Sequence, residues 1–507
     1  MRTLTVVTEA PPVRSGIAET VAQVTAGLRE LGHDVDLCTA ADVGRVSFGE
    51  FRLTGLVRHW PALLRDLDQY EVVNLHGPAP SFSDAFLALW RTVPRQRRPA
   101  LVYTHHSEIE LSNLGPVCRM YNSMHSKLMR AADGVVVSTP SYADSALRAG
   151  ARTVRIVPHG VHNDDLYASE QVLRAPRFTV AFVGQLRPYK GVDVMLHAAS
   201  ALPDVDFEIC GEGHQEVELR ELAARLRLDN VHWHGAVSNR RREEILRRAH
   251  VVALPSLTRA EAFGIVLLEG MRVGAVPIAS DLPGVRDVAG ATGLLCRPGD
   301  PRSLVQALCY LRDDPAEWAR RSVASVDTAG HYRWDDAALR YHYVYNEAVL
   351  DRRLASTIVH LEPAVGWVRK AAMSCRASLM LLDPTEETLR VSAVSGLALP
   401  DEALRAAVPL RQSLAGRALV AGEPCVIADR IELPDDPRQP QLRTAVCVPF
   451  SVHAGDVRGV LNLSRTDTRD YGWTDVDWAT RQASALARKL LRPGPSGLPV
   501  PVSTAAA

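Results

Sequence analysis

Along the first two thirds of the chain, short and nearly continuous apolar runs alternate with stretches in which apolar residues recur at helical spacing. The runs include "TLTVVTE", "DVDLCTA", "VVNLH", "ALVYTHH" and "GVVVSTP". Uninterrupted runs are typical of parallel strands buried on both faces, whereas half-exposed strands alternate in polarity. After the first run, apolar residues from Ile17 to Leu31 follow helical spacing, and Gly32 ends the helix. The pattern predicts a doubly wound parallel sheet.

A second series with the same alternation begins after "VRIVPHGVHNDDLY". Its predicted strands are "FTVAFVG", "FEICGEG", "NVHWHG", "VVALPS" and "AVPIAS". We therefore predict two Rossmann-like α/β domains that face a cleft, over residues 1–165 and 166–330. An aromatic-rich helix over 331–354 is expected to pack across both domains.

The pattern changes after about residue 355, where strands are joined by short turns. These strands are "ASLMLLD", "TLRVSAVSG", "EPCVIAD", "TAVCVPFSV" and "VRGVLNLSR", and a long helix follows them. We predict an α+β domain with a mainly antiparallel sheet over 355–491, and a disordered Pro/Gly/Ala-rich tail over 492–507. The change in pattern also predicts that a chain cut after about 355 still folds.

Composition places the chain among soluble globular proteins, with 47% hydrophobic and 23% charged residues. Acidic and basic residues balance at 58 each, which removes electrostatic support for nucleic-acid binding. The eight cysteines form no C-x-x-C pair, so neither a zinc site nor a disulfide framework is indicated. The start lacks the apolar core of a signal peptide, and no run reaches the ~18 apolar residues of a membrane span. A cytoplasmic location is expected. The basic stretch "RQRRP", Arg95 to Pro99, leaves peripheral contact with anionic lipids open, the alternative being a solvated loop.

Two loops have a composition suited to binding an anion. Gly16 follows the first strand and precedes a helix, so backbone N–H groups there can approach a ligand. Arg187 and Lys190 lie in "GQLRPYKG", just before another helix, where cations oppose the helix dipole unless an anion is bound. A bound diphosphate would neutralise both charges. The alternatives are a simple turn at Gly16 and a solvated loop at 185–191.

The stretch "EAFGIVLLEG" places two carboxylates around an apolar run. If a helix starts after Phe263, Glu261 lies in the loop and Glu269 in the second turn of the helix. The amides of Gly264 and Ile265 would then face a phosphate, with the carboxylates accepting hydrogen bonds from sugar and ribose hydroxyls on either side. The alternative is a buried carboxylate satisfied by backbone N–H groups.

Residues 1 to about 350 resemble the retaining glycosyltransferases of family 4, which have the GT-B fold. The motifs are "PPVRSGIAETVAQVTAGLRELGHDV", "YTHHSEI", "VRIVPHGV", "FVGQLRPYKGVDVML" and "ALPSLTRAEAFGIVLLEGMRVGAVPIASDLPGVRDV", in the order typical of that family.

The resemblance implies an NDP-sugar donor bound mainly by the second domain and an acceptor bound by the first. It implies that Gly16 and Lys190 contact the diphosphate, that Glu261 and His106 face the sugar, and that Glu269 lies near the ribose. The family usually has an arginine where this chain has Gln185, and Arg187 is the candidate replacement. Phe263, Gly264 and Ile265 complete the expected donor site. His76, which ends a strand on the cleft side, is either an acceptor contact or structural. His105 is expected to point into the first domain.

For this family, retention is explained by front-face attack, in which the leaving phosphate helps to deprotonate the acceptor. Glu261 and His106 are then positioning groups, and neither a metal nor a cofactor is expected. The "DVD" triplets at 34–36 and 204–206 look like metal-binding D-x-D motifs, but each lies at a strand entry.

Residues from about 355 to 490 resemble a GAF domain, through "ASLMLLD", "SLAGRALVAGEPCVIAD", "TAVCVPFSVHAGDVRGVLNLSR" and "YGWTDVDWATRQASALARKL". GAF domains are small-ligand pockets or dimerisation units, so both a sensor and a homodimer contact are open. Cys375, Cys425 and Cys447 are expected in its core. The leading hypothesis is a hexosyltransferase that the GAF domain modulates. The alternative is a non-catalytic regulatory protein with a degenerate transferase fold, which the Gln185 substitution supports. The acceptor stays open among a sugar, a lipid-linked glycan and a small molecule.

Overall fold

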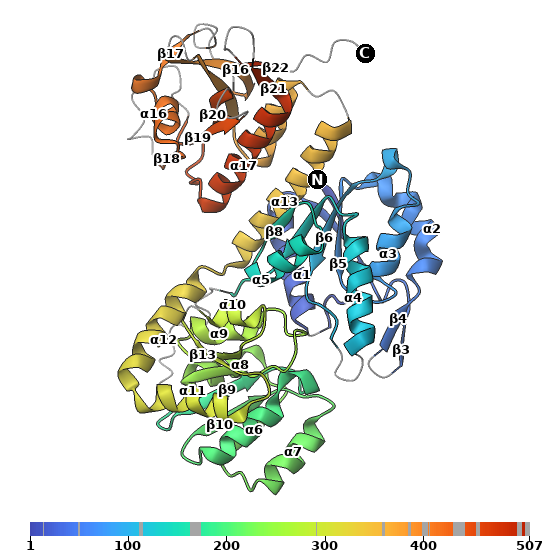
Figure 1. Ribbon diagram of the computed structural model, residues 1–507, viewed down its shortest axis with the longest axis vertical. Helices are drawn as coiled ribbons and strands as arrows, with labels where there is room; N and C mark the ends of the chain where they lie inside the picture. The colour runs from blue at the N-terminus through green and yellow to red at the C-terminus, as the bar shows by residue number, and fades with distance from the viewer. Residues whose placement is uncertain are drawn as a thin grey trace. The chain divides into compact units, whose positions relative to one another are not determined.

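The computed structural model describes residues 1–13, 15–48, 51–110, 115–162, 174–290, 292–356, 360–383, 387–397, 404, 406–428, 442–452, 457–493 and 499–501. The chain divides into two compact units, Met1–Tyr341 and His342–Ala507. The first unit contains two lobes, each built on its own sheet (Figure 1).

The N-terminal lobe contains a six-stranded parallel sheet in the order β2-β1-β5-β6-β7-β8. Its strands are β1 (Arg2–Val7), β2 (Asp34–Thr39), β5 (Val72–Gly77), β6 (Ala100–His105), β7 (Gly134–Val137) and β8 (Val154–Ile156). Its helices are α1 (Gly16–Glu30), α2 (Leu56–Asp66), α3 (Ser83–Trp90), α4 (Gly115–Met129) and α5 (Pro140–Arg148). The strand order reverses between β1 and β5, and doubly wound folds bind ligands outside the carboxyl ends of their strands at such a reversal.

The C-terminal lobe repeats this architecture with the parallel order β11-β10-β9-β12-β13-β14. Its strands are β9 (Thr179–Val183), β10 (Asp206–Cys210), β11 (Val231–Gly235), β12 (Val251–Leu254), β13 (Val276–Ser280) and β14 (Leu294–Cys296). Its helices are α6 (Val192–Ala201), α7 (Glu216–Arg225), α8 (Asn239–Arg248), α9 (Ile265–Arg272), α10 (Val285–Ala289), α11 (Pro301–Asp313) and α12 (Pro315–Gly330). Here the order reverses between β9 and β12, so the loops after these two strands lie together.

Helix α13 (Trp334–Ser356) contributes residues to both units. In the first unit Ala338 packs against α1 so closely that a Cβ atom added to Gly27 would lie 2.5 Å from the Ala338 side chain. Just before the helix, the Val161 N–H donates a hydrogen bond of 2.9 Å to the Tyr332 carbonyl. In the second unit Tyr343 stacks on Trp478 with ring centroids 4.5 Å apart. The helix is therefore part of two hydrophobic cores.

The second unit contains a six-stranded antiparallel sheet in the order β17-β16-β15-β20-β19-β18. Its strands are β15 (Arg376–Asp383), β16 (Thr388–Gly396), β17 (Val408–Pro409), β18 (Cys425–Ile427), β19 (Thr444–Val452) and β20 (Val457–Arg465). Helices α14 (Leu361–Ala371) and α17 (Trp473–Leu490) pack against the sheet and against each other, and α16 (Leu414–Ala421) also covers it. The predicted fold class, two doubly wound parallel domains followed by an α+β domain, is confirmed.

Several details differ from the expectation or were not foreseen. A hairpin of β3 (Arg45–Phe48) and β4 (Phe51–Thr54) and the edge strand β14 have no clear signal in the sequence. Of the three cysteines expected in the core of the second unit, Cys447 is buried, whereas Cys375 and Cys425 are partly exposed. The reason is position: Cys425 lies on the edge strand β18, and Cys375 lies in the turn before β15.

Within the region predicted to be a disordered tail, β22 (Pro499–Pro501) pairs with β21 (Leu491–Pro493). Residues 494–498 and 502–507 of that tail lie outside the described residues. Among the helices that the structure describes, none is both long enough and apolar enough to cross a lipid bilayer.

Candidate active site

The loops that follow β9 and β12 are in direct contact. Gly191 allows this, because it adopts φ +69° and a Cβ atom added to it would lie 2.0 Å from the Pro255 carbonyl oxygen. The Leu257 N–H also donates a hydrogen bond of 2.7 Å to the Tyr189 carbonyl. The two loops therefore form one wall at the carboxyl edge of the second sheet.

Lys190 and Glu261 form an ion pair in this wall. The exposed fractions of the two side chains are only 14% and 12%. Burial on its own would lower the pKa of Lys190, but the Glu261 carboxylate and the Tyr189 hydroxyl together outweigh burial and raise this pKa above its ordinary value. Lys190 therefore stays positively charged, and its ammonium lies beside Gly184, directly after β9.

Arg187 lies at the start of the short 3-10 turn Pro188–Lys190, two residues after the exposed Gln185. Its side chain is partly buried, and its guanidinium makes no hydrogen bond or ion pair with another residue in the described ranges. The charge of Arg187 opposes the rise in the pKa of Lys190, so the two cations are close enough to repel each other. An anion bound between them would relieve that repulsion.

Two helix N-termini, one from each lobe, lie next to each other. Helix α9 begins at Ile265, after Gly264 with φ +78°. Helix α1 begins at Gly16, and the Ser15 side chain caps it by accepting a hydrogen bond from the Ala18 N–H. A Cβ atom added to Gly16 would lie 3.8 Å from Ile265 Cδ1. Both ends present unsatisfied N–H groups and partial positive charge, a combination that binds phosphate in many proteins.

Glu269, in the second turn of α9, forms an ion pair of 3.1 Å with Arg242 of α8. Burial raises the pKa of Glu269 above its ordinary value, and Arg242 opposes this rise. The Glu19 carboxylate on α1 adds to the rise and itself lies 3.3 Å from His162 Nε2. Carboxylates from both lobes therefore lie near each other and can accept hydrogen bonds from ribose hydroxyls.

The N-terminal lobe contributes histidines at the ends of β5 and β6. His106 donates its backbone N–H to the Gly77 carbonyl over 2.8 Å, and its Nε2 lies 3.0 Å from His76 Nδ1. Burial lowers the pKa of His106 to about 3 and that of His159 to about 4, and it lowers the pKa of His76 well below its ordinary value. These imidazoles are therefore neutral near pH 7.

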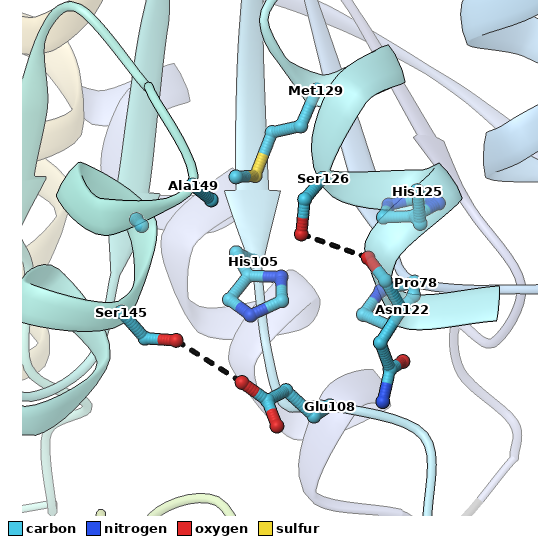
Figure 2. A pocket seen from close by; sticks show the side chains of 10 residues that line it. Pro78, His105, Glu108, Asn122, His125, Ser126, Met129, Ser145 and Ala149 are labelled. Carbon is cyan, nitrogen blue, oxygen red and sulfur yellow. Dashed lines mark hydrogen bonds between the residues drawn. The ribbon is translucent and has the colours of Figure 1, made fainter. Parts of the chain in front are cut away.

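His105, next to His106 in the chain, faces the interior of the N-terminal lobe (Figure 2). It lines a cavity of about 20 Å³ with His125 and Met129 of α4 and Ser145 of α5, room for about one water molecule. The Ser145 hydroxyl donates a hydrogen bond of 3.0 Å to Glu108, which also lines this cavity (Figure 2). His105 thus lies at an interior cavity of the lobe, whereas His106 lies beside His76 and His159.

Acidification is expected to destabilise the first unit through buried histidines such as His125, whose pKa burial lowers to about 4. The unfolded chain takes up the proton below about pH 6.5, so this contribution is fully present above that pH and is lost as the pH falls toward 4. Each such histidine contributes about 1.4 kcal/mol per pH unit between the two values. Urea unfolding at several pH values should show a shallower loss for His125→Gln than for the wild-type protein. Equal pH dependence in the two proteins would contradict the assignment.

Aspartates of both D-x-D-like triplets form ion pairs with arginines. Asp34 and Asp36 form ion pairs with Arg2, and Asp204 pairs with Arg312. In the part of the chain that the structure describes, no three His, Cys, Asp or Glu side chains gather as a metal site would require.

Contacts join several of the residues that the sequence singles out, one of them through His159. Phe263 is 3% exposed and meets His159 edge to face, with ring centroids 4.7 Å apart. His159 in turn lies parallel to His106, with centroids 6.5 Å apart. Lys190 contacts Glu261, two residues before Phe263. The loops of both lobes thus bring cations, helix N-termini, carboxylates and neutral histidines around one region.

Arg242 is one of the residues at this site that the sequence did not single out, as are His159 and Glu19. It lies in "NRRREEILRR", where the neighbouring arginines pair with glutamates of the same helix. Its contact with Glu269 depends on the packing of α8 beside α9, for which a single sequence carries no signal.

Comparisons with known proteins place these residues in a family. Residues 14–165 match the family described as Glycosyltransferase Family 4, residues 165–324 match Glycosyl transferases group 1, and residues 363–490 match the GAF domain. The chain is 31% identical over 260 residues to the D-rhamnosyltransferase WbpZ of Pseudomonas aeruginosa, which covers 49% of this chain and 65% of that protein. It is 31% identical over 304 residues to the phosphatidyl-myo-inositol mannosyltransferase of Mycobacterium leprae, covering 57% of this chain and 75% of that protein.

Solved structures show the same fold at lower identity. Sucrose-phosphate synthase from Thermosynechococcus elongatus superposes with a TM-score of 0.56 at 19% identity, covering 68% of this chain and 99% of that protein. Anabaena HepE in complex with UDP-glucose gives a TM-score of 0.51 at 18% identity, covering 67% of this chain and 97% of that protein. The chain belongs to the family 4 glycosyltransferases of GT-B fold, and it carries a GAF domain after the transferase lobes.

Proposed function

We propose that the protein is a metal-independent, retaining hexosyltransferase that takes its sugar from a nucleoside diphosphate donor. The observation that carries this proposal is the meeting of the α1 and α9 N-termini beside a wall that contains Lys190 and Arg187. Positive charge gathered at a helix N-terminus favours a diphosphate.

The proposed roles of the residues follow from the charges that develop in the transition state of sugar transfer. In the transition state the anomeric carbon becomes positive and the departing diphosphate becomes more negative. Lys190, Arg187 and the amides of Gly16, Gly264 and Ile265 would stabilise the leaving group, in a site whose dipoles are already oriented. Front-face attack then lets the leaving phosphate take the acceptor proton, so retention needs no enzymic nucleophile.

The ion pair between Lys190 and Glu261 indicates how the site is kept ready for the donor. Without a ligand, the two side chains, which have little exposure to solvent, neutralise each other's charge. When a diphosphate engages Lys190, the Glu261 carboxylate becomes available to accept hydrogen bonds from sugar hydroxyls. Glu269, held by Arg242, would bind ribose hydroxyls, and His106 would face the sugar from the other lobe.

Arg187 is proposed to replace the arginine that the family usually carries at the Gln185 position. The partly buried side chain of Arg187 has no partner among the described residues, and its charge acts on Lys190. One structural neighbour is in complex with UDP-glucose, and one relative is a mannosyltransferase. Both support a hexose donor. The acceptor, modulation by the GAF domain and dimerisation through it remain separate hypotheses.

A donor screen on the intact protein tests this function. Thermal unfolding is measured with UDP-glucose, UDP-N-acetylglucosamine and GDP-mannose, and release of the nucleoside diphosphate is followed for each. We expect one donor class to raise the Tm and to be turned over, while the matching nucleoside alone does neither. If no donor binds or reacts, the non-catalytic regulator suggested by Gln185 becomes the better reading.

A further inference from the structure

A line of hydrogen bonds runs from helix α13 to His106 through the interior of the N-terminal lobe. The Tyr341 hydroxyl lies 3.3 Å from Thr104 Oγ, and the Thr104 hydroxyl donates over 2.9 Å to Asn74 Oδ1. Asn74 Nδ2 lies 3.0 Å from His76 Nε2, and His76 Nδ1 lies 3.0 Å from His106 Nε2. The first four side chains belong to residues that are at most 4% exposed. The line ends at the one partly exposed member, His106.

The direction of each hydrogen bond along this line follows from simple chemistry. The Thr104 hydroxyl has a single hydrogen, which it donates to Asn74 Oδ1, so in the contact between the two hydroxyls Tyr341 is the donor. The other end of the Asn74 amide carries only hydrogens, so His76 Nε2 must accept. A neutral imidazole has one N–H, which in His76 is then on Nδ1 and points at His106 Nε2.

His106 therefore receives a hydrogen bond at Nε2 and carries its own hydrogen on Nδ1. Only one hydrogen fits between two imidazole nitrogens 3.0 Å apart, so the donor on one side requires an acceptor on the other. In the described ranges no side chain engages His106 Nδ1, so this N–H is the group that a ligand in the cleft can meet.

We propose that Asn74 and His76 are positioning residues that hold His106 in its Nδ1–H form, so that His106 donates a hydrogen bond to a sugar oxygen. The inference rests on the proposed function for the sugar, whereas the tautomer can be measured without substrate. His106 in this state is an electrostatic and orienting group, and Nε2 is not free to remove a proton from the acceptor. Burial, which lowers the pKa of His76 and of His106, keeps both rings neutral and so preserves the direction.

If these side chains served only to fill the core, apolar side chains could take their place. Apolar side chains of similar volume fill a core at lower cost than a chain of buried polar groups, which must all stay paired. Asn74 and His76 occupy alternate positions on β5 and therefore one face of that strand, and Thr104 is the direct neighbour of His76 on β6. The polar face thus runs along two central strands to the cleft end of the sheet.

The first test reads the tautomer in the ligand-free, full-length protein. With ¹⁵N-labelled histidine, long-range ¹H–¹⁵N spectra distinguish the two neutral tautomers, and the His106→Ala variant identifies the signal. We expect Nδ1 protonated and Nε2 unprotonated near pH 7. A proton on Nε2, or on both nitrogens, would overturn the proposal whatever the donor screen finds.

The second test is a double-mutant cycle with the nearly isosteric Asn74→Asp, since a carboxylate accepts from His76 and reverses every later hydrogen bond. Transfer from the donor found in the screen should fall about tenfold in kcat with little change in the donor KM. In the His106→Ala background the same substitution should change kcat by less than about twofold. An equal loss in both backgrounds would show that Asn74 acts elsewhere and would overturn the proposal.

Two further variants separate the proposed effect from misfolding and from nonspecific effects of a core substitution. Thr104→Val removes the hydrogen that orients the Asn74 amide while keeping volume, so it should give a mixture of His106 tautomers and a smaller fall in kcat. His125→Gln changes another buried histidine, 3% exposed and bonded to Tyr103, outside the line. It should leave the His106 tautomer and kcat unchanged, and a shift of either as large as that in Thr104→Val would count against the proposal.

Discussion

Replacing Lys190 by alanine is expected to lower kcat for sugar transfer about a hundredfold, equal to about 2.7 kcal/mol in the barrier. The ammonium is charged and has little exposure to solvent. Its attraction to the negative charge that develops on the departing diphosphate is therefore stronger than that of a fully solvated lysine. The measurement is initial-rate kinetics with the donor identified by the screen. Loss of ground-state binding alone would raise KM and spare kcat, so the two constants separate the roles.

The matched control is Lys127→Ala, because Lys127 is an exposed lysine of α4. This variant should keep wild-type kinetics. Because Lys190→Ala also strips Glu261 of its counter-charge, Glu261→Ala is measured beside it and is expected to lower transfer at least about tenfold. Near wild-type kinetics in both Lys190→Ala and Glu261→Ala would reject the site.

Replacing Arg465 by alanine is expected to lower the free energy of unfolding of the second unit by about 3–5 kcal/mol. Arg465 and Asp475 form an ion pair of 2.9 Å with side chains 1% and 5% exposed. The Tyr343 hydroxyl of α13 donates to the same carboxylate. Without the arginine, a buried carboxylate loses the cation that compensates its charge, which costs far more than a surface pair.

The control for this prediction is Lys489→Ala, which breaks an exposed ion pair of 2.7 Å with Asp351 between α17 and α13. It should change stability by no more than about 1 kcal/mol. Urea unfolding together with hydrogen exchange in peptides of α17 reports on this unit separately from the transferase lobes. Equal stability losses in the two variants would show that burial of the Arg465 pair has no special weight.

The elements and motifs that the sequence reveals are those with local signals. The run "VVALPS" predicts a buried strand, and "EAFGIVLLEG" favours a helix that starts after Phe263, because the glycine and the apolar spacing lie within a few residues. In the structure this helix, α9, begins at Ile265. The placement of Asn74 and His76 on one face of β5 could also have been inferred from the two-residue period of a strand.

Contacts between distant segments carry no such signal. The pairing of Glu269 with Arg242, and the line from Tyr341 to His106, depend on how separate helices and strands pack. The composition changes near residue 355, yet Tyr343 and Tyr345 of α13 are already buried in the second unit, at 1% and 0% exposure. A truncation that follows the structure therefore ends before His342, because a cut after 355 would uncover these rings.

The central claim is that a diphosphate is held between Lys190 and the paired helix N-termini, and calorimetric titration of the intact protein tests it most directly. UDP and GDP are compared with UMP and GMP on the wild-type protein and on Lys190→Ala. The account predicts that the preferred diphosphate binds at least about tenfold more tightly than its monophosphate, and that Lys190→Ala removes most of this difference. Equal affinities for the mono- and diphosphate, or a difference that survives in Lys190→Ala, would contradict it.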